Sequence, residues 1–504
     1  MDLWQQLGLG FHVALDPTNL LVCFLGVLLG TLIGVLPGLG PAASISLLLP
    51  LTFKMTPTGA IIMLAGIYYG AMYGGSTTSI LVNLPGEAAS VVTCLDGYQL
   101  ARQGRAGPAL GMAAFGSFIA GTLSIVGLMF LAPPLVEVAL KFGPPEYFSL
   151  MILGVMMVIF LASGSILKAL MMACFGFLLS SIGQDMVTGA MRFTLGVFEL
   201  SDGIGIVPVI MGLFGIAEVL ANLETLSTTK KDIYDGKITG LFPTLQDWAD
   251  SKWAIIRGSF IGFFLGVLPG GGALIASFVS YAVEKKVSKY PEKFGKGAME
   301  GVAGPESANN AACGGAFIPL LTLGIPANAV MAILLGALMI HNIIPGPFLM
   351  EKHPDLFWGT ICSMYIGNMM LLVLNLPLIG LWVNVLKLPY PILFPLILLV
   401  CLIGAYTLNG SLVEMVIMIL FGIIGYLLKK FSYETAPLVL ALVLGNMLEP
   451  ALRRSLIMSN GSFTIFFTRP ISLFLIVATV VFLISPLIWK LMGKSRPIMA
   501  EKEL

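Results

Sequence analysis

The seven residues GVLPGLG at positions 34–40 return as GVLPGGG at positions 266–272, an offset of 232 residues, and this pair decides the fold. Each copy places proline and glycines in the middle of an apolar run, where they interrupt a helix. The other matches, in chain order, are 74–75 with 314–315, Pro85 with Pro326, 164–165 with 410–411, and 175–176 with 421–422. An ordered series with slowly drifting offsets predicts two duplicated halves.

The composition indicates that lipid is the main solvent of the chain. Of the 504 residues, 57% are hydrophobic and only 11% are charged, against about 25% charged in soluble domains. Gly-X-Y periodicity and low-complexity tracts are absent from the sequence, and the 27 Lys and Arg are balanced by 26 Asp and Glu. These features exclude collagen, disorder and nucleic-acid binding.

The cysteines and the N-terminus carry little functional information. The six cysteines are scattered, without a C-x-x-C pair, and we interpret them as small apolar core residues. Lys54 is the first basic residue, so a positively charged signal-peptide region is lacking and the first apolar run is expected to be retained.

The apolar runs predict an all-α polytopic membrane protein with two inverted-topology repeats. A simple helical crossing needs about 20 residues, and the runs 19–53 and 258–284 are too long and are broken by Pro and Gly. We interpret these two as re-entrant hairpins and expect about 11 crossings besides them. The expected organisation is a first membrane repeat at 1–221, a cytoplasmic connector at 222–257 and a second membrane repeat at 258–504.

The distribution of lysine and arginine predicts the orientation of the hairpins. The second hairpin is flanked by Lys230, Lys231, Lys237, Lys252 and Arg257 on one side and by Lys285, Lys286, Lys289, Lys293 and Lys296 on the other. Positive loops stay in the cytoplasm, so both ends of this hairpin are expected there. The first hairpin, beside Asp16 and Lys54, has the opposite pattern. This charge distribution predicts a topology with the N-terminus in the periplasm and the C-terminus in the cytoplasm. Arg453 and Arg454 are the main residues that do not fit it, because they are basic but fall on the periplasmic side.

The hairpin tips predict an anion site near the membrane midplane. Broken helices expose backbone N–H groups and positive dipole ends, which attract anions, and two facing tips would form one site. The predicted substrate-binding residues here are Pro37, Gly38, Gly40 and Ser44 in the first tip and Pro269, Gly270, Gly271, Gly272 and Ser277 in the second. The alternative is that the glycines serve only close helix packing.

A second pair of broken segments is more polar and predicts further ligands. Its substrate-binding candidates are Ser76, Thr77, Asn83, Asn309, Asn310 and Asn328, and its coupling-ion candidates are Glu306, Thr78 and Thr322. Their oxygens suit a carboxylate substrate or Na⁺, and a membrane-embedded Glu306 suggests cation coupling. The alternatives are helix–helix hydrogen bonding, and an interfacial capping role for Glu306.

Missing motifs narrow the function. The sequence has no G-x-x-x-x-G-K-[ST] loop, no H-E-x-x-H and no G-x-S-x-G. We therefore expect a secondary transporter rather than an enzyme, with no cofactor other than Na⁺ as a candidate coupling ion. Two alternatives stay open: an uncoupled organic-anion channel or export subunit, and a membrane transferase using 222–257.

The motifs closely resemble those of the large membrane subunit of the tripartite tricarboxylate transporters (TctA-like). The resembling segments are 34–41 with 47–50, 68–85, 97–107, 268–281 and 301–326. The resemblance implies an inner-membrane symporter for citrate-like di- and tricarboxylates, driven by Na⁺ or H⁺. It also implies two partners, a small four-helix membrane subunit and a periplasmic solute-binding protein. By analogy with other two-hairpin transporters, we expect an elevator-type motion. Ala327 departs from the repeat, because glycine follows Pro85 in the first half.

Overall fold

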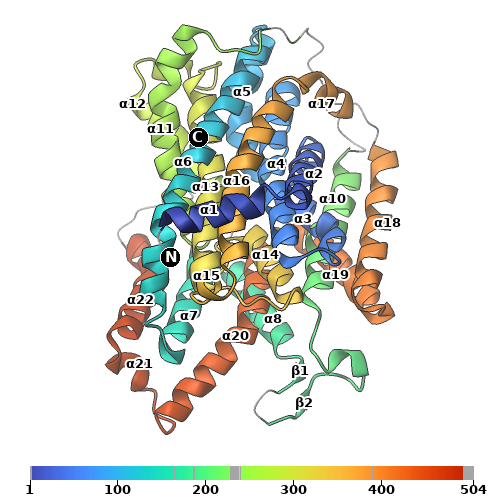
Figure 1. The fold of residues 1–504 in the computed structure, drawn as a ribbon, viewed down its shortest axis with the longest axis vertical. Helices are drawn as coiled ribbons and strands as arrows, with labels where there is room; N and C mark the ends of the chain where they lie inside the picture. The colour runs from blue at the N-terminus through green and yellow to red at the C-terminus, as the bar shows by residue number, and fades with distance from the viewer. Residues whose placement is uncertain are drawn as a thin grey trace.

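The computed structural model describes residues 3–162, 165–185, 188–226, 238, 240–386 and 390–491. Over these ranges the chain is mostly helical, and Figure 1 shows a bundle with α4 and α13 near its middle. The predicted all-α class is thereby confirmed, while the inverted repeats and the number of crossings stay predictions. Two parts of the predicted topology, connector residues 227–237 with 239 and the C-terminal residues 492–504, lie outside the described residues.

The first half of the chain contains the only strands in the described ranges. They are β1 (Gly183–Gln184) and β2 (Met191–Arg192), which pair antiparallel in a loop outside the apolar runs. Its helices are α1 (Leu3–Ala14), α2 (Pro17–Gly34), α3 (Pro41–Leu48), η1 (Leu49–Thr52), α4 (Pro57–Val82), η2 (Ala88–Ser90), α5 (Val91–Arg102), α6 (Ala106–Ala139), α7 (Pro144–Leu161), α8 (Ile166–Ser180), η3 (Phe198–Leu200), α9 (Ile206–Ile210), η4 (Met211–Ile216) and α10 (Ala217–Leu226).

The second half begins with a capped helix. The Thr244 hydroxyl accepts from the Asp247 backbone N–H, and the Asp247 carboxylate accepts from the Thr244 N–H, so α11 begins inside the region expected to be a connector. The helices are α11 (Leu245–Val267), α12 (Gly272–Val287), η5 (Pro291–Lys293), α13 (Glu300–Leu323), α14 (Ala329–Ile340), α15 (Leu349–Lys352), α16 (Pro354–Asn375), α17 (Ile379–Leu386), α18 (Tyr390–Asn409), α19 (Leu412–Lys430), α20 (Ala436–Met458), α21 (Ile465–Thr468) and α22 (Pro470–Leu491).

Seven helical segments within the described ranges are long and apolar enough to cross a membrane. They are Pro17–Gly34, Ala106–Ala139, Pro144–Leu161, Ile206–Glu224, Pro354–Asn375, Leu412–Lys430 and Ala436–Met458. Five shorter apolar segments accompany them, among them Pro41–Thr52 and Ala329–Ile340. The chain is therefore a multi-pass membrane protein.

The tips of the two predicted hairpins share a left-handed glycine. In the first, α2 ends at Gly34 and α3 begins at Pro41; in the second, α11 ends at Val267 and α12 begins at Gly272. The glycine after each tip proline is left-handed, with φ of 81° at Gly38 and 80° at Gly270. Glycine adopts this conformation without the penalty that a Cβ brings, so both breaks need glycine at this position.

The second pair of breaks also recurs at matching positions. Helix α4 ends at Val82 and is followed by Asn83 with φ of 55°, and α13 ends at Leu323 and is followed by Gly324 with φ of 73°. Both residues are left-handed helix C-caps, a common way to end a helix. Proline then follows at positions 85 and 326, where it prevents the helix from resuming directly.

Each half contains a seam of close helix packing built on glycines spaced four residues apart. On α2, an ideal Cβ at Gly30 would lie 2.4 Å from the Ile67 carbonyl oxygen of α4. On α11, a Cβ at Gly262 would lie 2.1 Å from the Ala308 carbonyl oxygen of α13. The flanking glycines on the same faces are Gly26 and Gly34 on α2, and Gly258 and Gly266 on α11. Their backbones approach so closely that hairpin and broken helix form one packed unit in each half.

Candidate functional site

The centre of the molecule holds a buried carboxylate on α13. Glu306 is fully buried, and its Oε2 accepts a hydrogen bond of 2.5 Å from the Ser76 hydroxyl of α4. Its Oε1 accepts another from the Thr93 hydroxyl of α5. Three helices from both halves of the chain therefore meet at one carboxylate.

A second buried carboxylate lies beside the first broken segment. Glu87 is 5% exposed, and its Oε2 accepts from the Ala89 backbone N–H at 2.7 Å. Its Oε1 accepts from the Asn309 side-chain amide at 3.0 Å. Asn309 is three residues after Glu306 on α13, so it shares a helix face with that carboxylate. The Asn309 carbonyl oxygen, Oδ1, is buried and has no hydrogen-bond partner.

Neither carboxylate forms an ion pair with any residue that the structure describes. A buried negative charge without a counter-charge carries a desolvation cost of several kcal/mol. The surrounding donors, hydroxyls and amides, offset only part of this cost. The site therefore favours either protonation or a bound cation, and its oxygen atoms suit a hard cation such as Na⁺.

The buried polar network continues on the far side of Glu306. Asn310 donates from its side-chain amide to the Ser117 hydroxyl of α6 at 2.7 Å and to the Glu306 backbone carbonyl at 3.1 Å. A separate buried carboxylate, Asp96 on α5, accepts from the Tyr281 hydroxyl of α12 at 2.9 Å and from the backbone N–H groups of Gly297 and Ala298. Asp96 thus holds the loop that leads into α13.

The first tip opens into a cavity that reaches this network. The cavity has a volume of about 400 Å³ and is lined by residues of the first tip, including Gly38 and Gly40, and by Gly86 and Glu87 of the first broken segment. Lys429 of α19 also lines it and pairs with Glu218 at 2.7 Å. Because Glu87 borders the cavity and also bonds to Asn309, a ligand at the tip would lie next to the buried carboxylates.

The second tip is held by the broken segment of its own half. The Gly270 N–H donates to the Ala327 carbonyl oxygen at 2.8 Å. A Cβ on Gly270 would meet the backbone of Val158 on α7 at 2.9 Å. The first tip, in contrast, lies against Asn222 of α10, whose Oδ1 would be 2.6 Å from a Cβ on Gly38. The two tips therefore contact different elements, and their joint anion site stays a prediction.

The structure brings some of the predicted site residues together. Ser76, Asn309, Asn310 and Glu306 belong to the buried network, and Thr77 is buried beside it. The glycines and prolines at 37, 38, 40 and 269–272 form the two tips. Thr78, a predicted coupling-ion ligand, donates to the Val35 carbonyl at 2.5 Å, which ties α4 to the first tip, and its role as an ion ligand stays a prediction.

Most other predicted residues bond with backbone groups, and Asn328 also donates to the Tyr68 hydroxyl of α4 at 3.4 Å. Ser44 donates to Gly40, Thr322 to Ile318, and Ser277 to Ala273 and Pro305, in each case to a backbone carbonyl. Asn328 caps α14 by accepting from the Met331 N–H at 2.9 Å, and Asn83 is an exposed C-cap. These five side chains support the helix ends and breaks around the network.

Three residues of the network are additions to the predicted set: Glu87, Thr93 and Ser117. The sequence could have marked Glu87 as a site candidate, because it directly follows Pro85-Gly86 and is one of only two acidic residues between Lys54 and Arg102. Nothing in the sequence marks Thr93 or Ser117, because each is an ordinary hydroxyl residue within a helix. Only tertiary packing across more than 190 residues reveals their contacts with α13.

Comparison with known proteins identifies a family and two similar sequences. The family model described as "Tripartite tricarboxylate transporter TctA family" matches residues 20–440. An uncharacterized 52.8 kDa protein in the TAR-I ttuC′ 3′ region of Agrobacterium vitis is 51% identical over 503 residues, covering all of both chains. An uncharacterized protein in the TAR-II ttuC′ 3′ region of the same organism is 51% identical over 242 residues, which is 48% of this chain and all of that protein.

No solved structure shows significant similarity to the chain. The family model nevertheless spans most of the sequence, including both tips, both broken segments and the buried network. The full-length relative supports the same assignment. This chain belongs to the tripartite tricarboxylate transporter TctA family.

Proposed function

We propose that this protein imports small di- and tricarboxylates such as citrate across the bacterial inner membrane by Na⁺ or H⁺ symport. A periplasmic solute-binding protein delivers the substrate, and a small four-helix membrane subunit completes the complex. The observation that carries the proposal is a pair of buried carboxylates without ion-pair partners among the described residues. Glu87 borders the cavity of the first tip, and Glu306 lies on the same helix as Asn309, which donates to Glu87. Because the TctA family is a family of transporters, transport is favoured over the transferase alternative.

Charge supplies the coupling in this proposal. Unit charges 4 Å apart at an effective dielectric of 20 interact by about 4 kcal/mol, so ionised Glu87 and Glu306 repel an anionic substrate near the tip. A Na⁺ or H⁺ bound at these carboxylates removes the repulsion. The oxygens available to Na⁺ are those of Glu306, Ser76, Thr93 and Asn309. Substrate therefore binds productively only after the cation.

In the proposed motion, the two hairpins are the mobile parts of the inverted repeats. Support comes from the matching breaks and from the glycine seams, which tie each hairpin to its own broken helix. Each unit would move across a scaffold in the manner of an elevator. A cysteine cross-link between the second tip and α7, on a background without native cysteines, should stop uptake. Undiminished uptake in the cross-linked protein would contradict the motion.

The proposal is tested by uptake into proteoliposomes that contain the full complex and the solute-binding protein. Labelled citrate should accumulate only when an inward Na⁺ or H⁺ gradient is imposed. Uptake that requires ATP would overturn the proposal. The alternative of an uncoupled channel or export subunit predicts counter-flow of labelled citrate without net accumulation, so the same vesicles separate the two functions.

The tips provide a prediction with a matched control. Gly38→Val places a β-branched residue at φ of 81°, and Gly104→Val does the same at φ of 79° in a loop with open space around it. Both substitutions cost about 1–2 kcal/mol in backbone strain. We expect Gly38→Val to reduce citrate uptake at least tenfold while the protein still inserts, and Gly104→Val to retain uptake. Equal uptake by both variants would remove the functional role of the first tip.

A further inference from the structure

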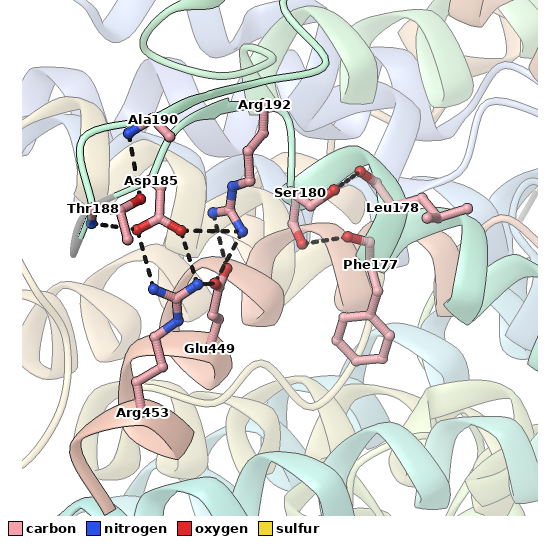
Figure 2. A network of polar contacts seen from close by, with 10 residues as sticks. Phe177, Leu178, Ser180, Asp185, Thr188, Ala190, Arg192, Glu449 and Arg453 are labelled. Carbon is pink, nitrogen blue, oxygen red and sulfur yellow. Dashed lines mark hydrogen bonds and ion pairs between the residues drawn. The ribbon is translucent and has the colours of Figure 1, made fainter. Parts of the chain in front are cut away.

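The two arginines that do not fit the predicted charge sidedness lie next to each other on α20 but in different surroundings. Arg453 donates to both carboxylate oxygens of Asp185, at 3.1 and 2.8 Å, and pairs with Glu449 at 2.7 Å. Arg192 donates to both Glu449 oxygens at 3.0 and 3.1 Å, which completes the network shown in Figure 2. Arg454 is exposed and forms no hydrogen bond or ion pair with any described residue.

This network fixes the loop that carries β1 and β2 onto α20. The hydrogen bonds from Arg192 to Glu449 raise the pKa of the Arg192 guanidinium above its ordinary value, which stabilises its positive charge. Asp185 also accepts from the Thr188 N–H at 2.8 Å, which closes the turn of the loop. Arg192 and Arg453 are thereby neutralised by carboxylates, and the positive charge of Arg454 remains available to a ligand.

Arg454 borders a large cavity, here named the Arg454 cavity, whose lining is mostly apolar with a few basic side chains. It has a volume of about 660 Å³ and lies between the N-terminal part of α7, the segment 342–353 and α20. Lys352 and His353 also line it, and no aspartate or glutamate does so among the described residues. A concave surface whose charged side chains are all basic concentrates anions.

Helix α20 presents one face, with two polar side chains and a proline, to this cavity. Asn446, Pro450 and Arg454 recur every four residues and share one helix face. They also border a neighbouring cavity of about 670 Å³ beside the Asp185 network, so they form a ridge between the two spaces. Because Pro450 has no N–H, the Asn446 carbonyl lacks its helical partner. The ridge thus offers a cation, a side-chain amide and a backbone acceptor.

The Arg454 cavity adjoins the second broken segment. Leu323, the last residue of α13, lines it, together with Pro345 and Gly346. The left-handed Gly324 packs on the same segment, since a Cβ there would lie 2.7 Å from the Pro345 carbonyl oxygen. An anion in the cavity therefore lies at the start of the break at 324–328, which in turn holds the second tip through Ala327.

We propose that the Arg454 cavity is an access site, where carboxylate anions bind before they reach the broken helices. Arg454 and Lys352 supply the positive charge, and the α20 ridge supplies hydrogen bonds to carboxylate and hydroxyl groups. The proposal rests on the proposed function for its substrate class, but it makes a separate claim about where the anion first binds. It also gives a reason for basic residues on the face predicted to be outside.

Chemical protection tests binding without transport. The purified chain is treated with phenylglyoxal, which modifies arginine, and the extent of modification at Arg454 and Arg102 is read by mass spectrometry. Both side chains are exposed and lack partners among the described residues. Citrate should slow modification of Arg454 at least threefold and leave Arg102 unchanged. Equal protection of both arginines, or equal protection by sodium chloride at matched ionic strength, would overturn the access site.

Uptake by variants tests the role of the site in transport. Arg454→Gln should raise the half-saturating citrate concentration about tenfold with little change in the maximal rate, since one charge-assisted hydrogen bond is lost. Arg454→Lys should restore most of this loss, and Lys141→Gln, which removes an exposed charge outside the lining, should match the wild type. An unchanged half-saturation in Arg454→Gln would overturn the access site while the symport function stands. Protection of Arg454 by citrate without gradient-driven uptake would instead contradict symport and retain the site.

Discussion

Glu306→Gln should reduce gradient-driven citrate uptake about 100-fold while the protein remains folded in the membrane. The amide has nearly the same shape as the carboxylate and can still bond with Ser76 and Thr93, so packing around α13 is preserved. It cannot carry a negative charge or take up a proton at neutral pH. The expected loss corresponds to about 3 kcal/mol, the upper range for a hydrogen bond to a charged group.

The measurement is uptake by proteoliposomes at several Na⁺ concentrations and pH values, with the amount of folded protein checked by size-exclusion chromatography. Glu137→Gln is the matched control, because it makes the same chemical change at an exposed carboxylate on α6. This control should retain wild-type uptake. Wild-type uptake by Glu306→Gln with unchanged ion dependence would show that Glu306 does not take part in coupling.

The variant Glu87→Gln distinguishes the role of Glu87 from that of Glu306. Its amide can no longer repel an anion in the tip cavity, so the variant should bind citrate with less dependence on the coupling cation. We expect uptake to fall, because substrate and cation are no longer bound in a fixed order. Citrate binding that stays as cation-dependent as in the wild type would contradict the charge-based coupling.

The positions of the helix breaks could be predicted from the sequence because they depend on local chemistry. Proline removes a backbone donor and glycine permits a left-handed φ, so paired Pro-Gly motifs indicate where helices stop. The structure has breaks at 35–40 and 268–271. The length of the hairpin arms could not be predicted in the same way. Helix α11 extends to Leu245, well outside the apolar run, because a capping box rather than hydropathy sets its start.

The partners of Glu306 could not be predicted from a single sequence. Its position in a polar segment marked it as a candidate, but Ser76 and Thr93 are 230 and 213 residues away along the chain. Thr78 and Thr322 were predicted as coupling-ion ligands because they lie in the same polar segments. Their hydroxyls donate to backbone carbonyls, and their role as ion ligands stays a prediction. On a helix, a shift of two residues changes the face, so composition alone cannot separate these hydroxyls from that of Ser76.

The glycine seams carry the second prediction with a large effect. Gly262→Ala should lower the stability of the protein by about 3 kcal/mol, because overpacking in a close-packed interior costs this much. The added methyl group would lie 2.1 Å from the Ala308 carbonyl oxygen, a backbone atom that cannot rotate away. Gly30→Ala should behave alike, because its methyl group would lie 2.4 Å from the Ile67 carbonyl oxygen in the first half.

The apparent Tm of the detergent-solubilised protein measures this effect, with Gly380→Ala as control. Gly380 lies in α17 with no atom within 4 Å of the added methyl group, so alanine there should raise stability by about 0.5–1 kcal/mol through helix propensity. A drop of several degrees for both seam variants, but not for the control, would show that the same contact supports both halves. If Gly262→Ala and Gly30→Ala matched Gly380→Ala, the helices would not pack through these glycines. The structural argument for two equivalent hairpin units would then fail, because the seams are the contacts that tie each hairpin to its broken helix.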